Sequence, residues 1–172
     1  KTLISESKKT ALVTGGIGGL GTAIAHSLAD RGHQVLVTYY VADNPDEWLA
    51  KQKEQGYDFK AYPVDVASFE SCQKMIEQIH ADGFKIDMLV NNAGITKDRS
   101  FRKMSQELWD DVLRTNLDSV FNVTKQVIED MLESGYRAGT MNYNPDIYIS
   151  YFEIKNESEK NDKDVDIRIK PL

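Results

Sequence analysis

A chain of 172 residues favours one domain with a core of its own, and its 41% hydrophobic and 28% charged residues are an ordinary globular balance. The net charge of −6 argues against a nucleic-acid-binding surface, which requires a basic field. The sequence has no run of about 20 apolar residues, so it predicts no membrane span. The single cysteine, Cys72, excludes an intramolecular disulfide.

The first part of the chain alternates strand and helix signals. Residues 10–16 form an apolar run that ends in glycines, which predicts a buried parallel strand. Apolar residues recur at helical spacing over residues 19–31, and Gly32 marks the end of that helix. Residues 34–40 predict a second strand, and residues 44–56 predict a helix with acids at its start and lysines later.

The same alternation continues to the end of a long helix. Residues 57–66 predict a third strand, and Ser68 can cap a helix over residues 69–81. Residues 86–92 predict a fourth strand, and residues 105–134 are helical for most of their length. This alternation predicts an α/β fold, a parallel sheet with right-handed crossovers and helices on both faces. From this pattern together with the family resemblance given below, we expect a Rossmann-type doubly wound sheet with strands in the order 3-2-1-4. We expect this domain to occupy residues 1–136.

Residues 137–172 differ in composition and predict a separate tail. Residues 137–146 read as loop, residues 147–154 are β-branched and aromatic as in a strand, and residues 165–170 alternate apolar and polar positions. The polar run between the two strands predicts a β-hairpin with a long loop. Such a hairpin can cover the open edge of the fourth strand, and a loosely ordered tail is the alternative.

The segment TGGIGGLG, residues 14–21, follows a strand and opens a helix, which is the context of a dinucleotide-binding loop. Gly15 permits the tight turn, Gly19 lets the backbone approach a pyrophosphate, and Gly21 lets the helix pack closely. The helix N-terminus offers N–H groups and the positive end of its dipole to the phosphates. A glycine-rich turn without a ligand is the alternative, and it leaves the two further glycines unexplained.

The end of the second strand bears on the choice between NAD and NADP. An acid there binds the ribose 2′-hydroxyl of NAD, whereas a base binds the 2′-phosphate of NADP. Tyr39 or Tyr40 occupies the usual acid position, so the signal for NAD is absent. No lysine or arginine follows, however, and Asp43, Asp46 and Glu47 would repel a phosphate. Because the acid that would indicate NAD is missing from its usual position, NADP is the predicted cofactor, and NAD remains the alternative.

With these elements in register, the chain resembles the short-chain dehydrogenases/reductases over residues 9–136. The segments NNAGITKDRSFRKM and NLDSVFNVTKQVI resemble the acetoacetyl-CoA reductases of that family. The resemblance implies a cofactor site built from the glycine loop, an acid after the third strand and the NNAG element. The expected cofactor-binding residues are Thr14, Gly15, Ile17, Gly18, Gly19, Leu20, Gly21, Tyr40, Asp65, Val66, Asn92, Ala93, Gly94 and Ile95.

Two further positions match residues that serve the reaction in the family. Asn116, in the long helix, matches the catalytic asparagine, and a solvent-facing asparagine is the alternative. Asp98 matches an acid that touches the acyl substrate, and a surface acid between two basic residues is the alternative. Asp65, matched to the acid that holds the adenine ring, can likewise be a turn residue.

The resemblance also implies a later strand that ends in serine and a helix that carries tyrosine and lysine four residues apart, for proton donation to the carbonyl oxygen. Tyr151 and Lys155 have this spacing, but the residues around them read as a strand. In a strand the pair lies about 13 Å apart and cannot act together. Thr140 is the nearest hydroxyl to the serine position, so we expect weak activity or none.

The resemblance implies NADP-dependent reduction of a 3-oxoacyl-CoA to a 3-hydroxyacyl-CoA. The alternatives are a 3-oxoacyl-carrier-protein reductase and a non-catalytic nucleotide-binding fragment. We expect a small acyl-CoA substrate as the partner, with no nucleic acid, membrane or metal; the family is homo-oligomeric, but its interface elements are not visible after residue 136. Residues 1–10 lack the apolar core of a signal peptide, so we expect the protein to be cytoplasmic.

Overall fold

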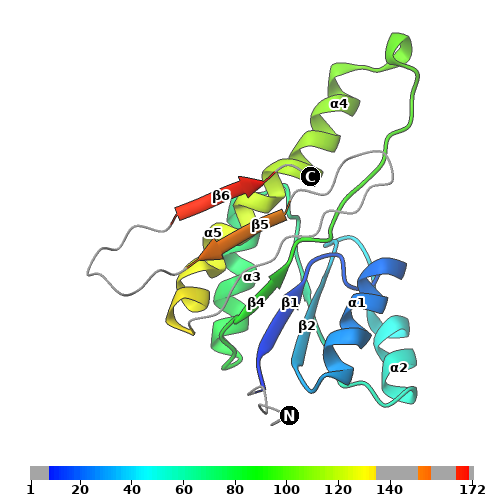
Figure 1. The fold of residues 1–172 in the computed structure, drawn as a ribbon. Helices are drawn as coiled ribbons and strands as arrows, with labels where there is room; N and C mark the ends of the chain where they lie inside the picture. Colours follow the sequence, from blue (N-terminus) through cyan, green and yellow to red (C-terminus); the bar gives the residue numbers. More distant parts are fainter. Residues whose placement is uncertain (1–7, 135–150, 156–165, 171–172) are drawn as a thin grey trace.

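The computed structural model describes residues 8–134, 151–155 and 166–170. Four parallel strands form its main sheet, in the order β3-β2-β1-β4 (Figure 1). Their bounds are β1 Thr10–Val13, β2 Gln34–Tyr39, β3 Lys60–Pro63 and β4 Met88–Val90. The parallel sheet and the order 3-2-1-4 confirm the predicted Rossmann-type fold.

Helices cover both faces of this sheet (Figure 1). One face carries α1 (Gly19–Asp30) and α2 (Asp46–Glu54). The other face carries α3 (Phe69–Ala81) and α5 (Ser119–Glu133). A single-turn 3₁₀ helix, Phe101–Lys103, precedes α4 (Gln106–Leu113), and the π-helical segment Arg114–Asp118 joins α4 to α5.

The core has two layers because successive side chains of a strand point to opposite faces of the sheet. Leu12 and Leu36 pack with the apolar sides of α3 and α5. Val13, Val35 and Val37 pack instead toward α1 and α2. Both faces are therefore apolar, which is why the strands read as continuous hydrophobic runs in the sequence.

The helix ends follow their expected signals. The Ser68 hydroxyl accepts a hydrogen bond from the backbone N–H of Ser71 at 3.2 Å and so caps α3. Gly32 and Gly56, which follow α1 and α2, have φ values of 88° and 89°, a backbone conformation that other residues rarely adopt. These residues fix where each helix stops and the next strand begins.

The tail contains β5 (Tyr151–Lys155) and β6 (Asp166–Lys170), which pair antiparallel as the predicted hairpin requires. These strands form a sheet of their own, whereas β4 pairs only with β1 among the described strands. The expectation that the hairpin covers the edge of β4 is therefore wrong. The predicted loop at 137–146 lies outside the described residues. So does the predicted polar connection at 155–164, except for Lys155, which is the last residue of β5.

Within the described ranges, every helix is too short or too polar to cross a lipid bilayer.

Candidate active site

The glycine loop between β1 and α1 lies directly on the end of β2. Gly15 has a φ of 62° and its N–H donates to the Thr38 hydroxyl at 3.1 Å. The N–H of Gly16 donates to the Thr38 carbonyl at 2.9 Å, and a Cβ at Gly16 would lie 2.5 Å from the Val37 side chain. The glycine at position 16 is therefore explained by packing against β2, without reference to a ligand.

The start of α1 packs against this loop and leaves an open face above it. A Cβ at Gly21 would lie 2.4 Å from the Gly15 carbonyl oxygen, so α1 approaches the loop as closely as predicted. A Cβ at Gly19 would meet nothing within 4 Å. Gly18, the N-cap, supplies no side-chain cap, and the first turn of α1 carries no acid.

The first turns of α2, α3 and α4 each carry an acid, whereas the first turns of α1 and α5 carry none. Open space at Gly19 and an uncapped helix start can accept the pyrophosphate of a dinucleotide.

A hydrogen-bonded clip joins the end of β1 to the segment after β4. The Thr14 hydroxyl accepts from the backbone N–H of Asn92 at 2.9 Å and from that of Ala93 at 3.0 Å. The Asn92 side-chain amide donates to the Thr14 carbonyl at 2.8 Å and to that of Gly15 at 3.2 Å. Thr14 is 1% exposed, so these hydrogen bonds are buried, and they hold the glycine loop against the NNAG element.

Asn116 lies in the π-helical segment and faces inward. It is 7% exposed, which excludes the solvent-facing alternative. Its side-chain oxygen accepts from the N–H of Ile95 at 2.8 Å, and its amide donates to the Ile95 carbonyl at 2.9 Å. In the described structure Asn116 therefore holds the segment after β4 in place, and π-helical turns are frequent at functional sites.

Asp65 is a turn residue, as one of its two alternatives predicts, and its match to the acid that holds the adenine ring stays a prediction. Its carboxylate accepts from the N–H of Ala67 at 3.0 Å, which makes it a turn residue, and it also lines a cavity. The neighbouring Val66 carbonyl accepts from the buried Asn122 amide at 3.0 Å. These bonds hold the segment after β3 against α5.

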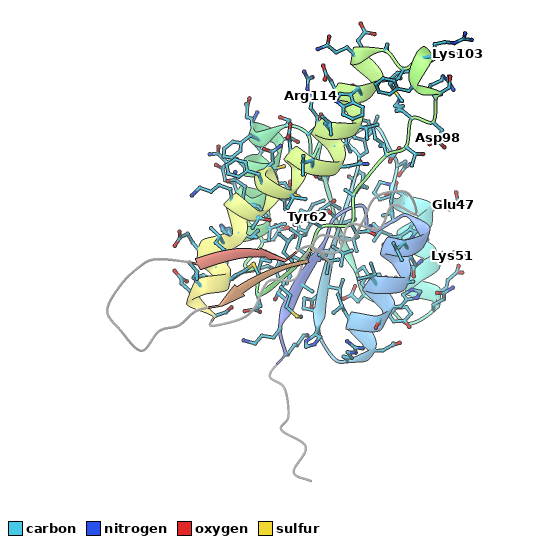
Figure 2. All side chains as sticks on the ribbon, turned by 45° about the horizontal axis from the view of Figure 1, so that its top comes forward. Glu47, Lys51, Tyr62, Asp98, Lys103 and Arg114 are labelled. Carbon is cyan, nitrogen blue, oxygen red and sulfur yellow. The ribbon has the colours of Figure 1, made fainter. Side chains whose placement is uncertain are left out.

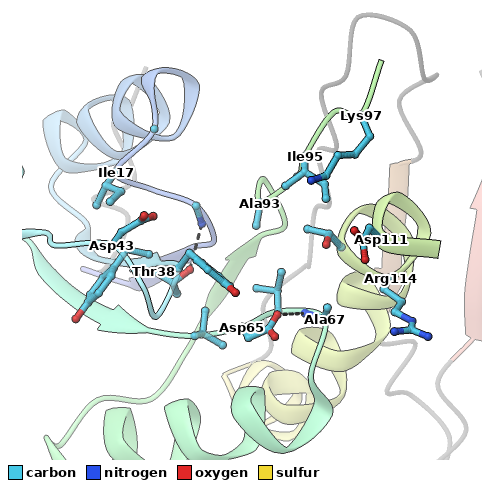
Figure 3. A pocket seen from close by; sticks show the side chains of 18 residues that line it. Ile17, Thr38, Asp43, Asp65, Ala67, Ala93, Ile95, Lys97, Asp111 and Arg114 are labelled. Atoms are coloured by element: carbon cyan, nitrogen blue, oxygen red, sulfur yellow. Dashed lines mark hydrogen bonds between the residues drawn. The ribbon is translucent and has the colours of Figure 1, made fainter. Parts of the chain in front are cut away.

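A cavity of about 700 Å³ opens at the carboxyl ends of the strands (Figure 3). This is where ligands bind in doubly wound α/β sheets. The predicted site residues that line it are Gly15, Ile17, Gly18, Tyr40, Asp65, Val66, Ala93, Gly94 and Ile95. The expected residues thus make up half of its lining and come from four separate segments.

The remaining predicted residues do not line this cavity. Four of them pack behind the residues that line it: Thr14, Gly21, Asn92 and Asn116. Two others, Gly19 and Leu20, are exposed at the start of α1, outside the cavity walls. Asp98 is also exposed outside the cavity, on the segment between β4 and α4 (Figure 2).

Several lining residues were not expected from the sequence. They are Thr38, Val64, Ala67, Lys97, Asp111, Arg114 and Thr115. Tyr39 and Asp43, which the sequence analysis named at the end of the second strand, also line the cavity. Thr38 and Tyr39 belong to β2, whose carboxyl end was a visible signal. Asp111 and Arg114 come from α4 and the π-helical segment, and no motif in the sequence marks them.

The charges of the cavity are unevenly placed. Lys97 and Arg114 line one side, and Asp43 lies on the opposite side, beside Ile17 (Figure 3). Asp65 and Asp111 contribute further carboxylates. The cavity therefore presents both signs of charge to a ligand, with its cations on one side, where Asp111 also lies, and Asp43 on the other.

In the described ranges, the candidates for a reactive site outside the cavity are a cysteine, a possible group of metal ligands and the pair Tyr151 and Lys155. Burial raises the pKa of the Cys72 thiol to about 12, so this cysteine is a buried, neutral thiol. Residues 8–134 and the two tail strands contain no group of three or more potential metal ligands. Tyr151 and Lys155 are the first and last residues of β5, and a strand keeps such a pair too far apart to act together. Thr140 lies outside the described residues.

The short chain dehydrogenase family model matches residues 9–140. Nodulation protein G of Azospirillum brasilense is 48% identical over 131 residues, which are 76% of this chain and 53% of that protein. Acetoacetyl-CoA reductase of Cupriavidus necator is 44% identical over 132 residues, which are 76% of this chain and 53% of the reductase.

A solved structure of a gluconate 5-dehydrogenase from Burkholderia cenocepacia J2315, in complex with NADP and tartrate, has a TM-score of 0.68 and 28% identity to this chain. The superposition covers 78% of this chain and 52% of that one. The chain spans about half the length of the curated relatives it matches.

Proposed function

Because the chain belongs to the short-chain dehydrogenase family, we propose that its cavity binds a nicotinamide dinucleotide for the reduction of a 3-oxoacyl thioester. The observation that carries this proposal is the glycine loop: a positive φ at Gly15, close packing at Gly21 and open space at Gly19. This arrangement leaves room for a pyrophosphate at the N-terminus of α1.

When bound, a nicotinamide dinucleotide supplies the hydride, and the residues of this chain bind and orient it. The glycine loop and the start of α1 hold the pyrophosphate, and Asp65 and Val66 flank the adenosine. Thr14, Asn92 and Asn116 are positioning residues, since their side chains fix the loop and the NNAG segment that line the cavity. NADP is the cofactor favoured by the sequence, and NAD is the alternative it leaves open.

The substrate proposed from the resemblance is acetoacetyl-CoA, which would become 3-hydroxybutanoyl-CoA. We expect the chain to be weakly active or inactive, because the described residues contain no tyrosine and lysine paired on a helix near the cavity. A nucleotide-binding role without catalysis is therefore the main alternative.

Isothermal titration calorimetry with NAD and NADP tests the binding proposal directly. A folded chain that binds neither dinucleotide would overturn it. Spectrophotometric oxidation of NADH or NADPH in the presence of acetoacetyl-CoA then tests catalysis. Tyr151→Phe is compared with Tyr148→Phe: if only the former loses a measurable activity, the tail supplies the proton donor after all and the expectation of an inactive chain is wrong.

A second candidate substrate is a 3-oxoacyl group on a carrier protein. Four exposed basic residues, Lys97, Arg99, Arg102 and Lys103, lie on the segment between β4 and α4, where Asp98 is the one acid (Figure 2). Such a surface complements the acidic helix of a carrier protein. A double variant, Arg102→Glu with Lys103→Glu, should lower the rate with an acyl carrier protein more than the rate with acyl-CoA. Equal effects on both substrates would argue against carrier-protein docking at this segment.

A further inference from the structure

A tryptophan of α2 donates a hydrogen bond to a threonine of α1, which lies on the same face of the sheet (Figure 1). The Trp48 indole N–H donates to the Thr22 hydroxyl at 2.9 Å. The indole ring is also held by packing, because it stacks on the buried Phe59 with the ring centroids 5.5 Å apart. Trp48 therefore presents its N–H to α1 from a packed position.

The direction of this hydrogen bond determines where the threonine can place its own hydrogen. An indole N–H is only a donor, so the Thr22 hydroxyl must accept from Trp48. A hydroxyl has one hydrogen, which remains for the loop carbonyls within reach. The Thr22 oxygen lies 2.7 Å from the carbonyl oxygen of Gly18 and 3.3 Å from that of Gly16. The indole thus directs the hydroxyl hydrogen toward the glycine loop.

The bonded carbonyls set the direction of N–H groups in the same loop. The Gly18 carbonyl also accepts from the backbone N–H of Thr22 at 2.8 Å, so two hydrogen bonds hold it. In a planar trans peptide the N–H points opposite to the carbonyl. The N–H of Gly19 is therefore turned away from Thr22, and a Cβ at Gly19 would meet nothing within 4 Å. The N–H of Ile17, which lines the cavity, is related to the Gly16 carbonyl in the same way.

We propose that Trp48 is a positioning residue for the phosphate-binding loop. The inference rests on the proposed dinucleotide-binding function and deepens it. Through the Thr22 hydroxyl, the indole holds the carbonyls of the loop and keeps its N–H groups directed at the place of the pyrophosphate before the ligand arrives. The helix α2 thus contributes to the pyrophosphate site, although Trp48 is not among the residues that line the cavity.

A double-mutant cycle on the full chain tests whether the tryptophan acts through the threonine. Trp48→Phe removes the N–H and keeps an aromatic ring, while Thr22→Val removes the hydroxyl and keeps the branched shape. Each single variant should bind the preferred dinucleotide, NAD or NADP, about three- to tenfold more weakly in isothermal titration calorimetry. The double variant should bind as Thr22→Val does, because no bond then remains for Trp48→Phe to break.

Two control variants separate loop positioning from general stability. Thr22→Ser keeps the hydroxyl and should retain most of the dinucleotide affinity. Trp109→Phe makes the same substitution at an exposed tryptophan of α4 outside the cavity and should leave the affinity unchanged. Urea unfolding checks that each variant is folded under the conditions of the titration. If Trp48→Phe does not fold, benzothienylalanine at position 48 takes its place, since it has the size of tryptophan but no N–H.

The outcomes separate this inference from the proposed function. Unchanged dinucleotide affinity after loss of the indole N–H overturns the role of Trp48 and leaves dinucleotide binding intact. An equally large loss of affinity from Trp48→Phe in the Thr22→Val background does the same, because the tryptophan then acts without the threonine. A folded, unchanged chain that binds neither NAD nor NADP overturns the proposed function and this inference together.

Discussion

Gly19 and Gly21 lie two residues apart at the start of α1, yet a methyl group at the two positions meets different surroundings. At Gly21 it would lie 2.4 Å from the Gly15 carbonyl oxygen and 2.7 Å from the Gly16 Cα, and backbone atoms cannot move aside cheaply. At Gly19 it would meet no atom within 4 Å. Packing therefore requires a glycine at position 21 but not at position 19, where we propose that the glycine serves ligand access.

We expect Gly21→Ala to lower the free energy of unfolding by about 1–3 kcal/mol, because the loop must shift to admit the methyl group. Its dinucleotide affinity should fall with it. Gly19→Ala should change the free energy of unfolding by less than about 0.5 kcal/mol and reduce dinucleotide affinity alone. Urea unfolding followed by circular dichroism measures the free energy of unfolding, and calorimetry measures the dinucleotide affinity. Equal stability losses in both variants would contradict this division of roles.

Cys72 gives the protein a defined response to alkaline pH. Burial, with a smaller contribution from the Asp65 carboxylate, raises its pKa from 9.0 to about 12. The unfolded chain therefore releases the thiol proton near pH 9, while the folded chain retains it. The stability contributed by the neutral thiol is fully present below pH 9 and is lost as the pH rises from 9 toward 12.

The free energy of unfolding should consequently fall between pH 8 and pH 10.5, with about 2 kcal/mol of the loss due to this thiol. Cys72→Ala removes the titrating group and should show a smaller loss over the same interval, although its stability at pH 8 is lower because of the cavity left behind. Urea unfolding at pH 8 and pH 10.5 measures this loss in the unchanged chain and in Cys72→Ala. Identical pH dependence in the two proteins would show that the thiol does not titrate differently on folding.

At the scale of elements, the junction between α4 and α5 is the part of the site that depends on a departure from regular helix. The π-helical segment Arg114–Asp118 places Asn116 inward, against both backbone groups of Ile95. The same segment places Arg114 and Thr115 on the cavity wall. One local widening of the helix thus supports the NNAG segment and contributes to the ligand surface.

Asn116→Ala should cost about 1–3 kcal/mol of unfolding free energy, because it leaves the N–H and carbonyl of Ile95 without their partner. Asn116→Asp keeps an acceptor for the N–H but sets a carboxylate oxygen against the Ile95 carbonyl at pH 7. Protonation lets that oxygen donate, so the stability deficit of Asn116→Asp relative to the unchanged chain should shrink between pH 7 and pH 4.5. A deficit that does not depend on pH would rule out this contact as its cause.

The regular elements were predictable from the sequence because their signals are local. Apolar runs marked the strands, Ser68 marked the start of α3, and Gly32 marked the end of α1. The parallel sheet with helices on both faces followed from the alternation of elements, and the glycine loop led directly to one wall of the cavity. These features depend on neighbouring residues or on the general chirality of α/β crossovers.

The opposite wall was not predictable, because it depends on how distant elements meet. Asp111 and Arg114 read as surface charges of a helix, and only the packing of α4 above the sheet brings them to the cavity. The π-helical turn has no sequence signal of its own beyond the poor helix former at Asn116. The separation of the tail strands from β4 likewise depends on pairing that the tail sequence does not specify.

On the scale of the whole molecule, charge opposes association while two surfaces favour it. The net charge is −6 at pH 7. In the described sheet, β4 pairs only with β1, so its other edge is open. Leu117 and Phe121, one helical turn apart, are 60% and 64% exposed.

We expect light scattering from the purified chain to rise as the pH falls from 7.5 to 5.5, because the net negative charge decreases and the chains repel each other less. Added salt at pH 7.5 should act in the same direction by screening. Phe121→Glu adds a negative charge and removes an exposed ring, so it should reduce scattering under both conditions. Scattering that is insensitive to pH and salt would mean that charge does not control association.

The contact between α2 and the glycine loop gives the protein an optical probe of its own. The Trp48 indole N–H donates to the Thr22 hydroxyl at 2.9 Å, and that hydroxyl donates to the Gly18 carbonyl at 2.7 Å. Any ligand that tightens or displaces the loop must disturb this chain of bonds and therefore the indole's emission. Since Trp109 is the second of two tryptophans, Trp109→Phe would leave Trp48 as the single tryptophan, whose emission monitors the loop without an attached dye.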